Sequence, residues 1–188
     1  MTTSKLVSAW GRFKEALVKT SALGADALRQ PASEETITTA ETQLCFSLPE
    51  ELSALYRIHD GIVPPEDEIP TAFAVCYFIP LLGVDGLVDE QSCWREMPCY
   101  PNTGLSTEET KDMIPFAKDF GGNHLLVSCQ DGLCTVWRHD HENGLPLKRI
   151  ASSLAEFIDK ERSYLEQGQD IEHLINYDDD YRYLPQDD

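Results

Sequence analysis

The chain of 188 residues is 41% hydrophobic and 26% charged, a balance typical of a globular domain and not of a disordered segment. Aspartate and glutamate number 33 against 15 lysines and arginines, so the formal net charge is -18. This excess of acid argues against binding to the phosphate backbone of nucleic acid, and no apolar run is long enough to span a bilayer. Charged residues near the start also interrupt the apolar stretch that a signal peptide needs, so we expect a cytoplasmic protein with no membrane partner.

Three helices are predicted in the first third of the chain. Apolar residues recur at helical spacing over residues 6–18 and give one amphipathic helix. A second helix begins after Ser33, whose hydroxyl can cap it. The buried stripe of this second helix is Ile37, Ala40 and Leu44. A third helix begins at Pro49, and we expect Gly61 to end it in the left-handed conformation.

The pattern changes after the third helix. Residues 73–82, FAVCYFIPLL, are rich in β-branched and aromatic side chains and predict a strand. A short helix is expected over residues 84–97. Residues 98–112 show no period and contain several turn formers, so we expect a long loop there.

Alternating apolar residues in the second half of the chain predict an antiparallel sheet. Strands are expected over residues 114–117, 124–128 and 133–138. The last two of these strands form a hairpin, because the segment 130–132, QDG, has the composition of a tight turn. A further strand is expected over residues 145–150.

A closing helix follows, capped by Ser152 or Ser153 and ended by Gly168. Runs of helices separate from runs of strands predict the α+β class, with a mostly antiparallel mixed sheet and helices packed around it. We expect one domain over residues 1–168, the N-terminal helix included, and an acidic C-terminal arm over residues 169–188. Tyrosines alternate with acids in this arm, which fits either a contact surface or packing onto the domain.

The six cysteines could form three disulfides, but Cys45, Cys76 and Cys129 lie within apolar segments, as small buried side chains do. No CxxC pair occurs, and the spacings of the remaining cysteines match no zinc module. We therefore expect free thiols in a reducing compartment.

His59 and Asp60 form the first candidate metal or catalytic pair, and His124 and the segment 139–141, HDH, offer further donors. A first-row metal needs several donors that converge on it, and the spacing shows no such set. The sequence also lacks a nucleophile elbow, a phosphate-binding loop and a calcium loop. We expect no catalytic residue, no metal ligand and no cofactor; the enzymatic alternative is a metal-dependent hydrolase built on these histidines.

The segment PASEETITTAETQLCFSLPEELSALYRIHDGI, residues 31–62, resembles the SUKH superfamily, which includes a yeast cell-wall-synthesis regulator and many bacterial toxin-immunity proteins. Three later segments continue the resemblance in register: PFAKDFGGNHLLVSC, DGLCTVWRHDHE and IASSLAEFIDKE. Together these segments cover about residues 30 to 160. The residues that carry the resemblance are Ile37, Glu41, Leu48, Pro49, Leu55, Tyr56, Asp60, Gly61, Gly121, Gly122 and Asn123.

The resemblance implies an α+β domain without catalytic residues that acts by binding another protein. We expect an immunity protein that neutralises a cognate toxin of nuclease type, because an acidic surface attracts a basic domain. The alternative is a regulatory adaptor in cell-wall or signalling processes, and the oligomeric state stays open. The residues expected to contact the partner are acids and one aromatic outside the motif: Glu66, Asp67, Glu68, Asp85, Asp89, Glu90, Trp94, Glu108 and Glu109.

Overall fold

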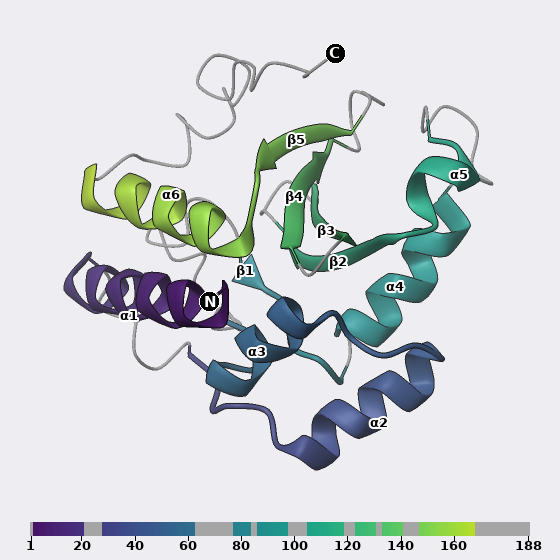
Figure 1. Cartoon of the computed structure of the whole chain (residues 1–188), viewed down its shortest axis with the longest axis horizontal. Helices are drawn as coiled ribbons and strands as arrows, with labels where there is room; N and C mark the ends of the chain where they lie inside the picture. Colours follow the sequence, from purple (N-terminus) through teal and green to yellow (C-terminus); the bar gives the residue numbers. More distant parts are fainter. Residues whose placement is uncertain are drawn as a thin grey trace, which may run out of the picture.

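The computed structural model describes residues 2–20, 28–62, 77–83, 86–97, 105–118, 123–130, 133–140 and 147–167. Its helices are α1 (Thr2–Thr20), α2 (Glu34–Leu44), α3 (Glu50–Ile58), α4 (Leu87–Glu96), α5 (Thr107–Thr110) and α6 (Leu154–Gln167). Its strands are β1 (Tyr77–Phe78), β2 (Met113–Lys118), β3 (His124–Gln130), β4 (Leu133–His139) and β5 (Lys148–Ala151). Figure 1 shows the strands gathered on one side of α3, with helices around them.

The strands form one sheet in the order β1-β2-β3-β4-β5, so each strand pairs with its neighbours in sequence. Strands β3 and β4 pair without interruption, from His124 opposite His139 to Gln130 opposite Leu133. Register shifts interrupt the pairing of β2 with β3 and of β4 with β5. Every described strand pair is antiparallel, which confirms the α+β class; no parallel pair is found among these strands.

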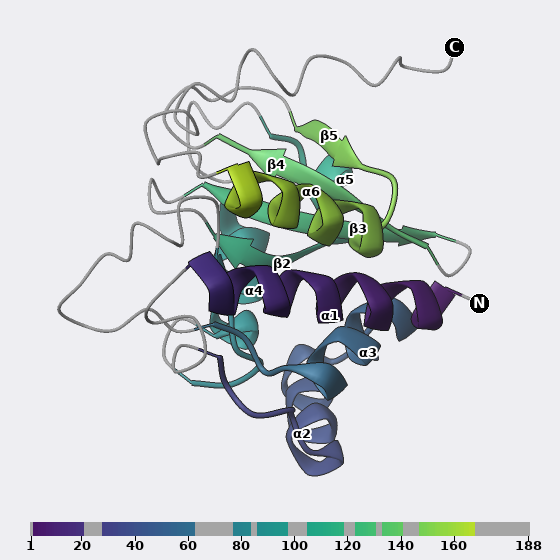
Figure 2. The same cartoon turned by 90° about the vertical axis from the view of Figure 1, so that its left-hand side faces the viewer.

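Helices cover both faces of this sheet. Helices α1 and α6 lie side by side over one face, and α4 lies against the other (Figures 1 and 2). The alternation of side chains along β3 follows this arrangement: Leu125 and Val127 belong to the main core, whereas Leu126 packs with Trp94 of α4. A second, smaller core therefore lies beneath α4.

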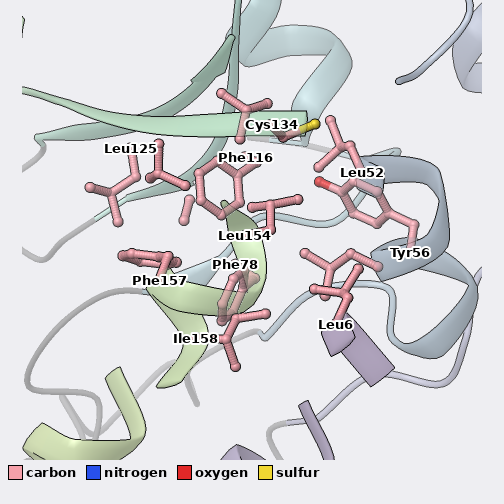
Figure 3. Close-up of a cluster of buried hydrophobic side chains, with 14 of the residues drawn as sticks. Leu6, Leu52, Tyr56, Phe78, Phe116, Leu125, Cys134, Leu154, Phe157 and Ile158 are labelled. Carbon is pink, nitrogen blue, oxygen red and sulfur yellow. The ribbon is translucent and has the colours of Figure 1, made fainter. Parts of the chain in front are cut away.

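Figure 3 shows the main core, where side chains from helices α1, α3 and α6 meet those of the sheet. The ring of Phe78 in β1 lies 5.9 Å from the ring of Phe116 and 6.3 Å from that of Phe157 in α6. Such tilted and edge-on ring pairs are the arrangements that aromatic quadrupoles favour. Because the cluster runs from Leu6 in α1 to Ile158 in α6, the terminal helices of the described fold share one core.

Local capping explains where two of the helices begin. The Ser33 hydroxyl accepts a hydrogen bond from the Thr36 amide at 3.0 Å at the start of α2. The Ser153 hydroxyl accepts from the Glu156 amide at 3.1 Å, and the Glu156 carboxylate accepts from the Ser152 amide at 2.9 Å. This arrangement is a variant of the capping box at the start of α6, in which the carboxylate bonds to the amide of the residue before the cap. The predicted stripe of α2 is confirmed, since Ile37, Ala40 and Leu44 are buried.

Two predicted boundaries are wrong. Helix α3 ends at Ile58, and the next residue, His59, already has extended backbone with φ -165° and ψ 125°. Gly61 does adopt a positive φ of 86°, but it lies beyond the helix end and serves a different purpose, described below. The expected loop over residues 98–112 contains the short helix α5, and residues 98–104 lie outside the described part of the chain.

Other predicted elements are described in part. The strand expected over residues 73–82 is too long, since β1 ends at Phe78 and the described residues 79–82 are not in a strand; residues 73–76 lie outside the described part. Strand β5 covers residues 148–150 of the strand expected over residues 145–150 and continues to Ala151. Gly168 and the acidic arm, residues 169–188, lie outside the described residues.

The expectation of free thiols is wrong for one pair, since Cys129 and Cys134 form a disulfide. They lie opposite each other on β3 and β4, with their Cα atoms 4.1 Å apart, and this close approach is what allows the bond. Cys45 is exposed, not buried, and has a left-handed φ of 61° at the end of α2. Cys93 on α4 is likewise an exposed free cysteine, and Cys76 and Cys99 lie outside the described residues.

Candidate protein-binding surface

The His-Asp-Gly corner that follows α3 is a structural joint. The Asp60 carboxylate accepts a hydrogen bond from the Leu81 amide at 2.9 Å, which ties the end of α3 to the segment after β1. Burial raises the pKa of Asp60, against the effects of this bond and of Arg29, whose guanidinium lies 3.9 Å away. Asp60 therefore bonds to a backbone amide that lies 21 residues further along the chain, and not to one at the end of its own helix.

Gly61 is required where the chain passes β1. A Cβ atom at this position would lie 2.7 Å from the Pro80 nitrogen and 2.8 Å from the Phe78 carbonyl oxygen, both of them backbone atoms. The positive φ of 86° also disfavours any residue with a side chain. The close approach lets the Ile62 amide donate to the Phe78 carbonyl at 2.7 Å.

The other motif residues also maintain the fold. The Glu41 carboxylate accepts a hydrogen bond from the Leu48 amide at 2.8 Å, which fixes the turn between α2 and α3. The buried Tyr56 hydroxyl donates to the Ile79 carbonyl at 2.9 Å. Pro49 is the N-cap of α3, where no amide donor is needed. Ile37, Leu48 and Leu55 are core side chains, Asn123 directly precedes β3, and Gly121 and Gly122 lie outside the described residues.

His59 is a buried histidine and not an evident ligand. Its imidazole packs 5.1 Å from the ring of Trp10, beneath α1, and neither ring nitrogen has a hydrogen-bond partner. Burial lowers the pKa of His59 to about 4, and the nearby cations Lys14 and Arg29 lower it further. At neutral pH the side chain is an uncharged part of the core.

The donors proposed for a metal do not come together. No group of three or more histidine, cysteine, aspartate or glutamate side chains able to hold a metal ion is found among the described residues. His139 lies on β4 opposite His124 and against Trp94, whereas His59 packs against Trp10 of α1. His141 lies outside the described residues.

Glu51 is a buried carboxylate that the sequence analysis did not single out. It is only 2% exposed, and its Oε2 accepts a hydrogen bond from the Cys134 amide at 2.9 Å, which joins α3 to β4. Burial raises the pKa of Glu51, and the amides of Cys134 and Ala155 act in the opposite direction. An acid in the first turn of a helix is normally interpreted as an exposed partner of the helix dipole, so no local pattern indicated this contact.

A family model described as the SMI1 / KNR4 family (SUKH-1) matches residues 31–160, which are 130 of the 188 residues. The chain belongs to the SUKH-1 family. This membership confirms the resemblance carried by the motif residues. A search among curated proteins found no match. Within the described residues, no helix of this SUKH-1 protein has the length and apolar character needed to cross a membrane.

Two of the expected partner contacts are not on the surface of the SUKH-1 fold. Trp94 is 0% exposed and forms the centre of the small core beneath α4. Glu90 is 6% exposed; it forms an ion pair with Lys118 and a hydrogen bond with His124, whose Nε2 lies 2.9 Å from Glu90 Oε2. These partners lower the pKa of Glu90 against the effect of burial. Both residues dock α4 on the sheet, so neither is available to a partner.

Exposed acids occur instead along α2, α4 and α5, which follow one another on the side of the SUKH-1 fold away from α1 and α6 (Figure 1). Asp89 and Glu108 are exposed as expected, and Glu108 forms an ion pair with Lys111. Four further exposed acids on these helices or next to them were not predicted as contacts: Glu34, which forms an ion pair with Arg57, and Glu35, Glu96 and Asp112. Of the remaining expected contacts, Glu66, Asp67, Glu68 and Asp85 lie outside the described residues, as does the side chain of Glu109.

Proposed function

We propose that this SUKH-1 protein is an immunity protein that neutralises a cognate toxin of nuclease type by binding it through an acidic surface. The observation that carries the proposal is the segregation of charge among the helices. Helix α2 has three acids and no base, and α4 has two exposed acids and one base, whereas α1 has four bases and one acid. We name the first of these regions the acidic side, defined by the exposed Glu35, Asp89, Glu96, Glu108 and Asp112.

An enzyme that acts on nucleic acid carries cations where the phosphates bind. The acidic side offers the opposite charge, and such complementarity raises the rate of association and excludes partners of like charge. Asp89 and Glu96 are well suited to this role, because no ion pair within the described residues engages either carboxylate. The acids expected at residues 66–68 and 85 remain predicted contacts.

The experiment is capture of partners from an extract of the source organism on the immobilised full chain, at low and at high salt. We expect a basic protein with nuclease activity, retained at low salt and released at high salt. The double substitution Asp89→Lys and Glu96→Lys should abolish retention. The matched control, Glu15→Lys with Glu166→Lys on α1 and α6, changes the net charge equally and should retain the partner.

A different outcome would favour a regulatory adaptor. Neutral or acidic partners that stay bound at high salt, and that bind equally well to the Asp89→Lys, Glu96→Lys protein, would contradict neutralisation through the acidic side. The family match is compatible with such a role, so the capture experiment and not the fold decides between the two.

A further inference from the structure

The outer face of α1 is uncovered and apolar. Among the described residues, the exposed large hydrophobic side chains are Val7 and Val18, each 49% exposed, and both lie on α1. Gly11 lies between them, and a Cβ atom there would meet nothing within 4 Å. Spacings of four and seven residues place the three positions in one stripe, opposite the buried side chains of the same helix. This stripe lacks a partner within the described fold.

Basic side chains border this stripe, although the whole chain carries -18. At about 100° per residue, Lys14 lies beside the stripe, whereas Lys5 and Lys19 lie with Arg12 along the edge toward α6, and Glu15 lies between that edge and the stripe. Arg12 is engaged by Asp159 of α6, with nitrogen to oxygen distances of 2.7 to 3.2 Å. No ion pair within the described part of the chain engages Lys5, Lys14 or Lys19. An apolar stripe bordered by lysines is complementary to a segment that carries apolar side chains and acids. The family match starts at residue 31, so α1 lies outside it.

The structure places the end of α6, from which the C-terminal arm continues, beside the end of α1. Helices α1 and α6 lie side by side and run in the same direction (Figures 1 and 2), and the Arg12 to Asp159 contact aligns them. Seven residues beyond this contact are Lys19 on α1 and Glu166 on α6, so the two helices end near each other. The 21 residues that follow Gln167 therefore leave the fold at the end of α1 that carries Val18.

The arm has the length and composition to cover α1. A helix of 19 residues is about 28 Å long, and an extended chain covers about 3.3 Å per residue, so about nine residues of arm would span it. Residues 168–188 contain seven acids and one arginine. Their apolar side chains include Ile171, Leu174, Ile175, Tyr177, Tyr181, Tyr183 and Leu184.

We propose that residues 168–188 dock on the outer face of α1, with their apolar side chains on the stripe at Val7 and Val18 and their acids against Lys14 and Lys19. Tethering favours this contact, because the arm is present at a high effective concentration beside α1. A second copy of the chain is a poorer occupant. A dimer that pairs α1 with α1 would bring like charges together. A contact between α1 of one copy and the acidic side of the next joins two different surfaces, so it would extend into a chain of copies and not form a closed dimer.

Docking of the arm covers the basic helix and leaves the acidic side as the open charged surface. Docking of the arm on α1 is a contact within one chain, so its presence or absence does not depend on which partner binds the acidic side.

The test is methyl NMR on the full chain, with the methyl groups of valine, leucine and isoleucine labelled. We expect nuclear Overhauser contacts from the Val7 and Val18 methyls to residues of the arm. The double substitution Lys14→Glu and Lys19→Glu, on the exposed side of α1, should remove these contacts. The control Lys148→Glu with Arg149→Glu, on exposed β5 positions, should keep them. Adding Asp178→Lys and Asp179→Lys to the α1 variant should restore them by exchanging the charges.

Absence of contacts between the arm and these valines in the unsubstituted chain would overturn the proposal. Contacts that appear only between differently labelled molecules in a mixed sample would overturn it in favour of a second copy.

Discussion

Replacing Gly61 with alanine should destabilise the fold because of what surrounds this one position. The new Cβ atom would lie 2.7 to 2.9 Å from backbone atoms of Phe78, Ile79 and Pro80, which cannot rotate away as a side chain can. We expect about 1 to 3 kcal/mol from overpacking and about 1 to 2 kcal/mol from the positive φ of 86°. The lower entropy of the unfolded alanine chain returns about 0.4 to 1 kcal/mol. The expected net loss is about 1 to 4.6 kcal/mol, centred near 3 kcal/mol.

Urea unfolding measures this loss as a shift of the midpoint. With an m value of about 2 to 3 kcal/mol per molar urea, the midpoint should fall by about 1 M. Two other glycines provide matched controls with the same substitution. Gly83 has a positive φ of 111° but open space around it, so Gly83→Ala should cost only about 1 kcal/mol of strain. Gly11 lies inside α1 with nothing nearby, so Gly11→Ala should stabilise by about 0.5 to 1 kcal/mol. If Gly61→Ala cost no more than Gly83→Ala, the argument from close backbone approach would be refuted.

Three further predictions test the buried polar groups. The pKa of His59 is about 4 in the fold and about 6.5 in the unfolded chain. Its contribution to the free energy of unfolding is therefore complete above pH 6.5 and is lost as the pH falls through 4, which removes about 3 kcal/mol. The His59→Phe protein has no such group, so its free energy of unfolding, measured against pH, should not show this loss. The raised pKa values of Glu51 and Asp60 make the fold more stable, not less, as the pH falls. Both groups are present in the unsubstituted chain and in the His59→Phe variant, so the difference between the two pH profiles isolates His59. Lys118→Met leaves the buried Glu90 carboxylate without the lysine cation and should lower the free energy of unfolding by about 2 to 4 kcal/mol at pH 7. This loss should shrink in acid, where Glu90 is protonated. A loss of stability independent of pH would contradict the ion-pair account. Tyr56→Phe should cost about 1 to 2 kcal/mol in thermal unfolding, because the Ile79 carbonyl loses its donor, and an unchanged midpoint would show that this bond contributes nothing.

Signals within a few residues predicted much of the fold. The Ser33 and Ser153 caps, the stripe of α2 and the strands of the second half all follow from local patterns and are found in the structure. The disulfide also had a local signal. A hairpin with a two-residue connection at residues 131–132 places Cys129 opposite Cys134, yet the apolar surroundings of Cys129 were taken as evidence of a buried thiol.

Contacts between distant segments could not be predicted in this way. Asp60 bonds to an amide 21 residues away and Glu51 to one 83 residues away, and nothing in the adjacent sequence indicates either. Glu90 is the clearest example, because a glutamate on a polar helix is normally solvated. It is buried only because Lys118 and His124, on two neighbouring strands, lie beneath it. Burial of a charge is a property of the assembled fold, so the exposed acids could be chosen correctly only once the structure was known.

The central claim is that the acidic side blocks a basic nuclease, and the most direct measurement is a titration of the activity of the captured enzyme with the purified full chain. We predict complete inhibition at an equimolar ratio and low salt, with an apparent Kd that rises steeply with salt and is weakened by Asp89→Lys with Glu96→Lys. The Glu15→Lys, Glu166→Lys control should inhibit like the unsubstituted chain. A bound enzyme that keeps its full activity at saturating inhibitor, or an affinity that both double variants leave unchanged, would contradict neutralisation through this surface.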